Sequence, residues 1–366
     1  MFFRSLTCIF AMTAVLTIRA EPVSLGTGSQ PRILSDGAQK VAVVFGRQDE
    51  ILISNSLDGG RTFTPARTLA RLKGMPLGMR RGPRVALTSK SMVVTAIEAE
   101  KGNVQDGDLV AWVSSDEGKS WEKSKQPLNS GPGAAREGLH GLASNRTGTV
   151  VSVWLDMRNT PKDRSGTEVW MGLSKDGGLT WQSDQVVYRH PGGSVCECCH
   201  PSVIIDDANK IHVMFRHAKD GARDMYLTSS GDQGKTFTEP QKLGRGTWPL
   251  NACPMDGGEL ILDANGGVHT TWMRDGSVFI AVPDHDEKQL GAGRDPVIVA
   301  SSMDIWMGWN NGNILISKMV ERSRETIGGR RSIVFCGWAQ RGKGICNAIN
   351  LNYLGPFFAP YSVFQK

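Results

Sequence analysis

Three cysteines, a glutamate and a histidine occupy five consecutive positions, Cys196 to His200, in the stretch "GSVCECCHPS". A second short motif, "NACPMDGG", adds the thiol of Cys253 and the thioether of Met255. Thiolate, imidazole and thioether groups are soft ligands that suit Cu(I), or Zn(II) where four of them form a tetrahedron. One interpretation is therefore a copper or zinc site whose candidate ligands are Cys196, Cys198, Cys199, His200, Cys253 and Met255.

The same cysteines support two other interpretations. In an oxidising compartment an even number of cysteines favours disulfides, so Cys253 would bridge one cysteine of the cluster. The other two would form a second link, or Cys198 and Cys199 would close a ring between neighbours. Alternatively, His200 lowers the pKa of one thiol, which then acts in redox or nucleophilic chemistry. A bridge and a metal can also coexist, with Glu197 orienting a ligand.

A second group of candidates is cationic. The residues that would bind an anionic ligand are Arg32, Arg158, Arg216, Arg223, Arg274 and His140. A guanidinium group suits a carboxylate because it binds both oxygens at once. The alternative is that Arg47, Arg158, Arg216 and Arg274, which recur at one place in a repeat, pair with nearby acids at the rim. Glu197 and Asp156 are the candidate catalytic carboxylates.

A repeat positions these residues. The segments "SLDGGRTF", "SSDEGKSW", "SKDGGLTW" and "SGDQGKTF" share one template, and their aspartates, Asp58, Asp116, Asp176 and Asp232, are 58, 60 and 56 residues apart. In each box the aspartate accepts hydrogen bonds within a tight turn, and the glycine two residues later adopts a backbone angle that other residues resist. Each box should therefore join two antiparallel strands and have a structural role.

The strands that precede each box also repeat. First strands such as "PRILSD" and "PRVALTS" recur six times, each followed by a second and a third strand. Copies five and six lack the box but have Asp275-Gly276 and Asn311-Gly312, which are strong hairpin signals. The sequence predicts an all-β fold, a six-bladed β-propeller of four-stranded blades over residues 21–322, with two β-sandwiches as the alternative. The Cys196–His200 and Cys253–Met255 segments should then meet at the funnel.

The boxes and strands resemble those of the sialidase superfamily, whose members carry Asp-boxes on a six-bladed propeller. For an exo-sialidase the resemblance implies three arginines that clamp a carboxylate, a Tyr–Glu nucleophile and an aspartate acid/base. The chain departs from that pattern: Phe45-Gly46-Arg47 replaces the aspartate, His200-Pro201 replaces the glutamate pair, and Trp306 and Trp309 stand near the expected tyrosine. "CECCHPS", "RDMYL" and "NACPMDGG" resemble a group of exported bacterial Asp-box proteins, which implies fold and export but no reaction.

The ends of the chain suggest how it is delivered. Arg4, the apolar run "LTCIFAMTAVLTI" and Ala20 have the layout of a secretory signal peptide of residues 1–20, so we expect a periplasmic or secreted protein with no membrane span. The net charge of +6 falls to +4 without Arg4 and Arg19, which does not indicate nucleic-acid binding. Residues 323–366 hold one strand-like run, "SIVFCGWA". Either that run or the N-terminal strand of the mature chain would close the last blade.

These observations favour a non-hydrolytic binding protein. Its ligand would be a soft metal such as copper, an anionic glycan or another small molecule at the funnel. The alternative is an exo-sialidase-type glycoside hydrolase, which needs two carboxylates on either side of the scissile bond. A propeller that serves as a rigid protein-binding platform is a third interpretation.

Overall fold

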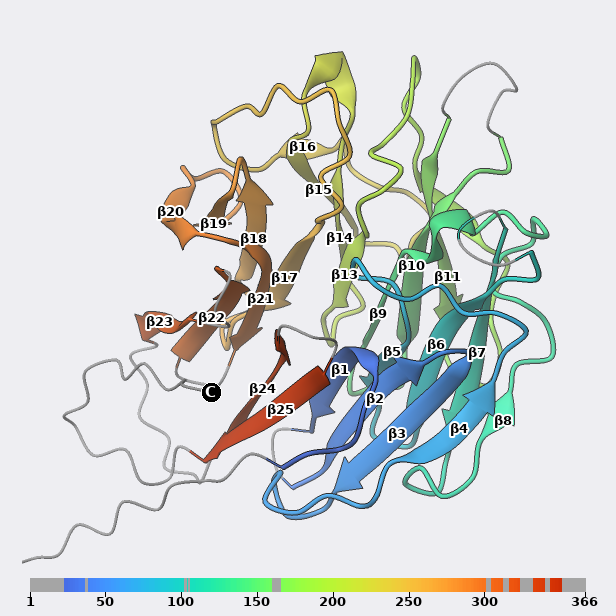
Figure 1. The fold of residues 1–366 in the computed structure, drawn as a ribbon. Helices are drawn as coiled ribbons and strands as arrows, with labels where there is room; N and C mark the ends of the chain where they lie inside the picture. The colour runs from blue at the N-terminus through green and yellow to red at the C-terminus, as the bar shows by residue number, and fades with distance from the viewer. Residues whose placement is uncertain are drawn as a thin grey trace, which may run out of the picture.

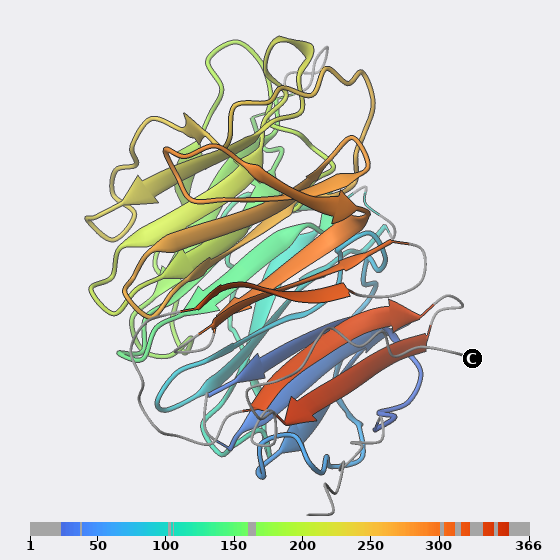
Figure 2. The ribbon, with the colours of Figure 1, turned by 90° about the vertical axis from the view of Figure 1, so that its left-hand side faces the viewer.

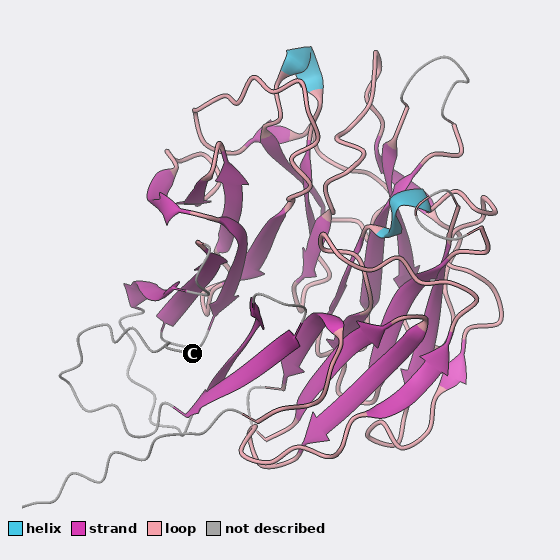
Figure 3. Ribbon diagram, viewed as in Figure 1, coloured by secondary structure: helices cyan, strands magenta, loops and turns pink. Residues whose placement is uncertain are grey.

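The computed structural model describes residues 23–36, 39–101, 104, 106–159, 166–300, 304–311, 316–322, 332–339 and 343–350, the last three ranges as backbone. The expected signal peptide and the residues after 350 lie outside this part of the chain. Strands dominate, and the helices within these ranges are two short 3₁₀ turns, Arg136–Gly138 and Lys219–Gly221 (Figure 3). Neither turn has the length and apolar character that crossing a membrane requires.

The strands form antiparallel sheets in which chain neighbours pair. Blade one comprises β1 (Ser29–Ser35), β2 (Val41–Arg47), β3 (Glu50–Ser56) and β4 (Arg67–Arg71). Blade two comprises β5 (Arg84–Leu87), β6 (Met92–Glu98), β7 (Asp108–Ser114) and β8 (Glu122–Lys123). Blade three comprises β9 (His140–Ser144), β10 (Val150–Asp156), β11 (Glu168–Ser174) and β12 (Gln185–Tyr188).

The second half of the chain continues the pattern. Blade four comprises β13 (Ser202–Ile205), β14 (Ile211–Arg216), β15 (Met225–Ser230) and β16 (Gln241–Lys242). Blade five comprises β17 (Gly258–Leu262), β18 (Val268–Arg274), β19 (Ser277–Ala281) and β20 (Lys288–Ala292). The sixth sheet has β21 (Arg294–Ala300), β22 (Asp304–Asn310) and β23 (Ile316–Arg322), and a separate hairpin has β24 (Ser332–Ala339) and β25 (Lys343–Asn350).

The first strand of each blade lies innermost. Figure 1 shows β1, β5, β9, β13, β17 and β21 around a common centre, and from β1 to β17 each contacts the first strand of the blade that follows it in the chain. The middle strands, such as "VAVVFG" in β2, are apolar on both faces because each blade packs between two neighbours. One core cluster, for example, joins Val153 and Leu155 of blade three to Val203 and Ile211 of blade four. This packing fixes the positions of side chains that the inner strands direct to the centre.

The prediction of an all-β propeller is confirmed, but the prediction of six four-stranded blades is wrong. Five sheets have four strands, and the sixth has three within the described ranges. The run "SIVFCGWA" forms β24, which pairs with β25 rather than with β23, and the hairpin contacts β1 (Figures 1 and 2). The N-terminal strand β1 pairs with β2. The sixth copy lacks an Asp-box, and within the described ranges no fourth strand pairs with β23.

The four Asp-boxes are turns between the third and fourth strands, as predicted. In each, a serine hydroxyl donates a hydrogen bond to the aspartate and accepts one from the N–H of the glycine. In blade one, Ser56 Oγ lies 2.8 Å from Asp58 Oδ1, and Gly60 N lies 2.8 Å from Ser56 Oγ. The Asp275-Gly276 hairpin is confirmed too, because both residues have the positive φ that a type I′ turn requires, 49° and 69°.

We predict that Asp58→Ala lowers the free energy of unfolding by about 1 kcal/mol. Partial burial by itself would raise the pKa of Asp58, but hydrogen bonds from Thr62, Ser56 and Arg61 N–H lower it to about 2. The variant loses these acceptors and leaves the turn donors to water. Urea unfolding at pH 7 measures the change, with Glu122→Ala on β8 as the control for loss of an exposed carboxylate. Equal midpoints for both variants would contradict a structural role of the box.

Candidate functional site

Three inner strands place charged side chains at equivalent positions. Arg32 on β1, Arg84 on β5 and Glu259 on β17 each stand three residues before the end of their strand. Arg32 Nη1 donates to Glu259 Oε1 at 2.7 Å, although the two residues are 227 positions apart in the chain. The centre of the propeller is therefore a polar site rather than an apolar core.

A further arginine from the loop before β5 enters this site. Arg80 Nη1 donates to Glu259 Oε1 at 2.9 Å, and its Nη2 donates to the carbonyl of Pro296 at 2.8 Å. Its guanidinium also lies 3.9 Å from Asp256 and 3.5 Å from Asp295. Arg80, Met255 and Asp295 all have positive φ, at 69°, 57° and 54°. Such backbone angles in residues other than glycine are costly and concentrate at functional sites.

Arg84 lacks the carboxylate that its neighbours have. It is 6% exposed, and the partners given by the described residues are three backbone carbonyls, those of Arg80, Gly82 and Pro83. Burial and then the charge of Arg32 lower the pKa of Arg84 well below its usual value, and the charge of Glu259 offsets this only in part. Three acceptors leave two of the five guanidinium N–H groups for another partner. A buried guanidinium without a directly bonded carboxylate is costly, so this position favours an anion.

His200 lies next to these arginines. The side chain is 3% exposed, and neither ring nitrogen has a hydrogen-bond partner in the described part of the chain. Burial, followed by the charges of Arg80, Arg32, Arg84 and Arg216, lowers the pKa of His200 well below its usual value. Gly257 allows the ring to pack here, since a Cβ at that position would lie 2.5 Å from His200 Nδ1. His200 is therefore a neutral imidazole with two unused polar atoms.

Arg216, at the end of β14, holds backbone rather than an acid. The residue is 1% exposed, and its guanidinium donates to the carbonyls of Asp256 at 3.0 Å, Met273 at 2.8 Å and Arg223 at 2.5 Å. These carbonyls belong to three separate segments of blades four and five. Arg216 therefore fixes the loop that carries Asp256, and three of its five N–H donors are used for this purpose.

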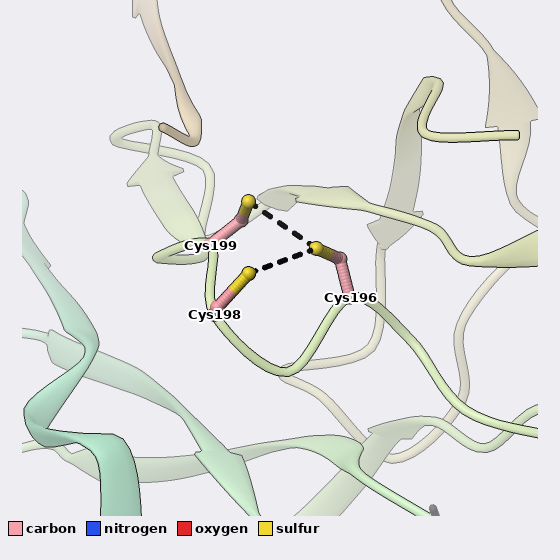
Figure 4. A group of neighbouring side chains, drawn as sticks. All are labelled: Cys196, Cys198 and Cys199. Atoms are coloured by element: carbon pink, nitrogen blue, oxygen red, sulfur yellow. Dashed lines mark hydrogen bonds between the residues drawn. The ribbon is translucent and has the colours of Figure 1, made fainter. Parts of the chain in front are cut away.

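The cysteine cluster forms a compact group of sulfur atoms between the loops that precede blades four and five. Cys198 forms a disulfide with Cys253, whose Cα lies 6.1 Å away. Figure 4 shows Cys196 facing the two other cysteines of its motif, with its Sγ 3.3 Å from that of Cys199 and 3.7 Å from that of Cys198. Cys196 and Cys199 are free thiols. The predicted bridge from Cys253 to the cluster is confirmed, and it excludes a ring between Cys198 and Cys199. The predicted second link is wrong, because Cys196 and Cys199 are not bonded to each other.

The two free thiols have different acidities. The hydrogen bond with Cys199 lowers the pKa of Cys196 to about 7, against burial and with help from the N–H of Cys198 and the charge of Arg216. Burial and the neighbouring Cys196 raise the pKa of Cys199 well above its usual value. Cys196 is therefore the more readily ionised of the pair.

The disulfide reduces the predicted set of metal ligands. Within the described ranges, the group with ligand atoms mutually within 4.8 Å comprises Cys196, Cys198 and Cys199, and no nitrogen of His200 belongs to it. In the bridge, Cys198 and Cys253 offer no thiolate, which is the form that binds soft metals. Met255 packs against the cluster. Of the candidate cysteines in the described ranges, Cys196 and Cys199 then remain as free thiols close to each other.

Several predicted residues lie away from the centre. Arg158 pairs with Asp156 at 2.7 Å and with Asp184 at 2.5 Å, and Arg274 pairs with Glu287 at 2.7 Å. These ion pairs match the alternative in which rim arginines pair with nearby acids. Of the remaining three candidates, Arg223 lies on the loop after β14, where its charge helps to lower the pKa of Cys196, and Glu197 is close enough to raise the pKa of Glu137. His140, by contrast, belongs to the centre: it is buried on the inner strand β9 with Nε2 3.0 Å from Thr95 Oγ1, and burial followed by the charges of Arg84 and Arg32 lowers its pKa well below its usual value.

The sequence reasoning missed Arg80, Arg84, Asp256 and Glu259. A signal for two of them was present, because "PRVA" in the second first strand repeats "PRIL" in the first, and "GELI" places a glutamate in the same column. The role of Arg80 and Asp256 depends on loop conformation, for which the repeat offers no template.

Comparison with known proteins places the fold. A family model described as a BNR repeat-like domain matches residues 80–319. An α-L-arabinanase of Penicillium chrysogenum, solved with arabinobiose, is similar with a TM-score of 0.54 and 14% identity over 83% of this chain and 95% of that chain. An α-L-arabinofuranosidase of Fusarium graminearum, solved with an iminosugar inhibitor, is similar with a TM-score of 0.52 and 11% identity over 81% of this chain and 92% of that chain.

A leech intramolecular trans-sialidase is also similar, with a TM-score of 0.49 and 10% identity over 83% of this chain and 70% of that chain. At these identities the likeness concerns the fold alone. A search of curated proteins gave no match. The family match covers well over half of the 366 residues and includes three of the four Asp-boxes. The chain therefore belongs to the BNR repeat-like domain family, the sialidase-like propellers.

Proposed function

We propose that this chain is an exported, non-hydrolytic binding protein for an anionic saccharide, with the acidic group of the sugar held at the propeller centre. The observation that carries the proposal is Arg84, a buried guanidinium that the described residues provide with carbonyl partners but no carboxylate. A carboxylate or sulfate would supply the missing counter-charge.

The surroundings of Arg84 support an anionic ligand. Four guanidinium groups, those of Arg32, Arg80, Arg84 and Arg216, lie close enough to affect the pKa of His200. Glu259 and Asp256 are the buried acids among them, and burial raises the pKa of Asp256 despite the charge of Arg80. Positive charge therefore exceeds negative charge at the centre. The neutral ring of His200 adds one donor and one acceptor for a sugar hydroxyl.

The arrangement of acids supports binding rather than hydrolysis. A glycoside hydrolase needs two carboxyl groups available on either side of the bond. Glu259 is held by Arg32 and Arg80, and Asp156 by Arg158 and the indole N–H of Trp154. The two tyrosines within the described ranges, Tyr188 and Tyr226, pack around His217 rather than beside a glutamate.

The proposal is tested by isothermal titration with N-acetylneuraminate, glucuronate, a galactose sulfate and neutral arabinose. We predict that Arg84→Gln weakens binding of the preferred anion about 10- to 100-fold, because one charge-assisted hydrogen bond is worth about 1.5–3 kcal/mol. Arg84→Lys should retain part of the affinity, since lysine keeps the positive charge but cannot bind two oxygens of the anion at once.

Arg146→Gln is the matched control, because that arginine is exposed and pairs with Asp207 at the surface. Thermal unfolding of each variant verifies that it is folded. Equal affinity for neutral and acidic sugars, or binding that Arg84→Gln leaves unchanged, would refute the proposal. Turnover of a chromogenic glycoside from a panel of acidic and neutral sugars would instead support the glycoside hydrolase.

A further inference from the structure

We propose that Cys196, Cys199, Cys198 and Cys253 form an internal thiol–disulfide relay that exchanges the Cys198–Cys253 bridge for a Cys196–Cys199 bridge. The sulfur positions carry this inference. Cys196 Sγ lies 3.7 Å from one sulfur of the bridge and 3.3 Å from the Cys199 thiol, so it stands between the two possible pairs. Nothing in the anion-binding role requires this arrangement.

The exchange balances without an external reagent. The Cys196 thiolate attacks Cys198 Sγ, a Cys196–Cys198 bond forms, and Cys253 leaves as a thiolate. The Cys199 thiolate then attacks Cys196 Sγ, and Cys198 leaves. The protons lost by Cys196 and Cys199 are taken up by Cys253 and Cys198. One disulfide and two thiols are present before and after, so no electrons are gained or lost.

Burial restricts access to three of the four cysteines. The exposed fractions of Cys196, Cys198 and Cys199 are 3, 4 and 1%. Cys253 is exposed, so an outside thiol has access to that end of the bridge, whereas the buried Cys198 end lies beside the Cys196 thiol. The exchange among the four cysteines needs only rotation about side-chain bonds and small shifts of the two loops. The short C-E-C-C spacing keeps the attacking thiols within reach.

The exchange has a structural consequence, because the present bridge ties the loop before blade four to the loop before blade five. The second loop carries Asp256, whose carbonyl accepts from Arg216 at 3.0 Å and whose carboxylate accepts the N–H of Asp295 at 2.9 Å. The first loop leads directly from Cys199 into His200. Release of Cys253 therefore frees a loop that borders the arginine group.

The test is differential alkylation of the purified full-length protein, prepared without reductant. Free thiols are labelled with N-ethylmaleimide in acidic denaturant, disulfides are then reduced and labelled with the deuterated reagent, and fragment masses locate each label. Peptide mapping keeps the four cysteines apart from Cys336 and Cys346, which face each other across β24 and β25. We expect a main population with free Cys196 and Cys199, and a minor population of about 1–10% with free Cys198 and Cys253.

Two serine variants identify the attacking thiol. Cys199→Ser blocks the second step, so the Cys196–Cys198 intermediate and free Cys253 should still be detected. Cys196→Ser removes the first nucleophile, so free Cys253 should disappear. Free Cys253 at the same level in both variants would overturn the relay. Thermal unfolding verifies that both variants are folded.

Three results with the wild-type protein would also overturn the relay. One is a single pairing, with Cys198 and Cys253 never labelled in the first step. Another is complete bridging of all four cysteines, which leaves no thiol to attack. The last is a copper or zinc ion retained in the native mass, with Cys196 and Cys199 held as its ligands.

Discussion

Glu259→Gln is expected to lower the free energy of unfolding by about 2–4 kcal/mol, because it leaves two guanidinium groups without their shared partner in a largely buried site. The Glu259 side chain is 18% exposed, and it accepts from Arg32 at 2.7 Å and from Arg80 at 2.9 Å. The amide keeps the shape and one acceptor oxygen but loses the charge. Chemical denaturation at pH 7 measures the difference from the wild type.

The pH dependence separates loss of charge from loss of packing. Burial by itself would raise the pKa of Glu259, but Arg32 and Arg80 lower it below its usual 4.5. A carboxyl whose pKa is lower in the folded chain contributes stability above its ordinary pKa, and this contribution is lost as the pH falls through the lowered value. The difference in the free energy of unfolding between wild type and variant should therefore be largest near pH 7 and should decrease below pH 4.5.

Glu98→Gln is the matched control. The Glu98 side chain is 17% exposed, close to that of Glu259, but its partner is the half-exposed Lys123 at 2.8 Å. An ion pair with an exposed partner contributes less than about 1 kcal/mol. Similar losses for both variants, or a gap for Glu259→Gln that is constant with pH, would show that the central pair is not a charged buried network.

The repeat explains how much of the fold could be predicted. The segments "PRILSD", "KVAVVFGR" and "ILISNS" are predicted as strands and form β1, β2 and β3. Such strands can be predicted because an apolar run bounded by turn residues is a signal in the local sequence. The Asp275-Gly276 turn follows from the same local rule. The sixth sheet departs from the prediction because closure of a propeller depends on contacts between chain ends, which no repeat unit encodes.

The site was predicted less completely, and the reason is again physical. The family resemblance singled out Arg32, which lies at the centre in the structure, whereas equivalence within the repeat grouped Arg47, Arg158, Arg216 and Arg274 as one kind of residue. The structure gives three of them a nearby acid and gives Arg216 only backbone carbonyls. Whether an arginine at a strand end pairs with an acid depends on the loops of its own and the neighbouring blade, which differ in every copy.

That difference between equivalent arginines leads to a second large effect. Arg216→Met is expected to lower the free energy of unfolding by about 3–5 kcal/mol, because three buried carbonyls, at roughly 1–2 kcal/mol each, lose their donor at once. The methionine keeps much of the apolar volume, so the loss reports the hydrogen bonds rather than a cavity. Urea unfolding followed by tryptophan fluorescence measures it.

Arg47→Met provides the comparison at the same place of blade one. The Arg47 side chain is 45% exposed and pairs with Glu50, so its replacement should change stability by less than about 0.5 kcal/mol. A large loss of unfolding free energy for Arg216→Met, together with a small one for Arg47→Met, would identify Arg216 as the residue that holds the Asp256 loop in place. Any loss of ligand binding in Arg216→Met would then follow from movement of that loop, and only Arg84 variants would report direct contact with the anion. Equal small effects at both positions would mean that the three carbonyls find other donors, and Arg216 would again be a candidate for binding the anion itself.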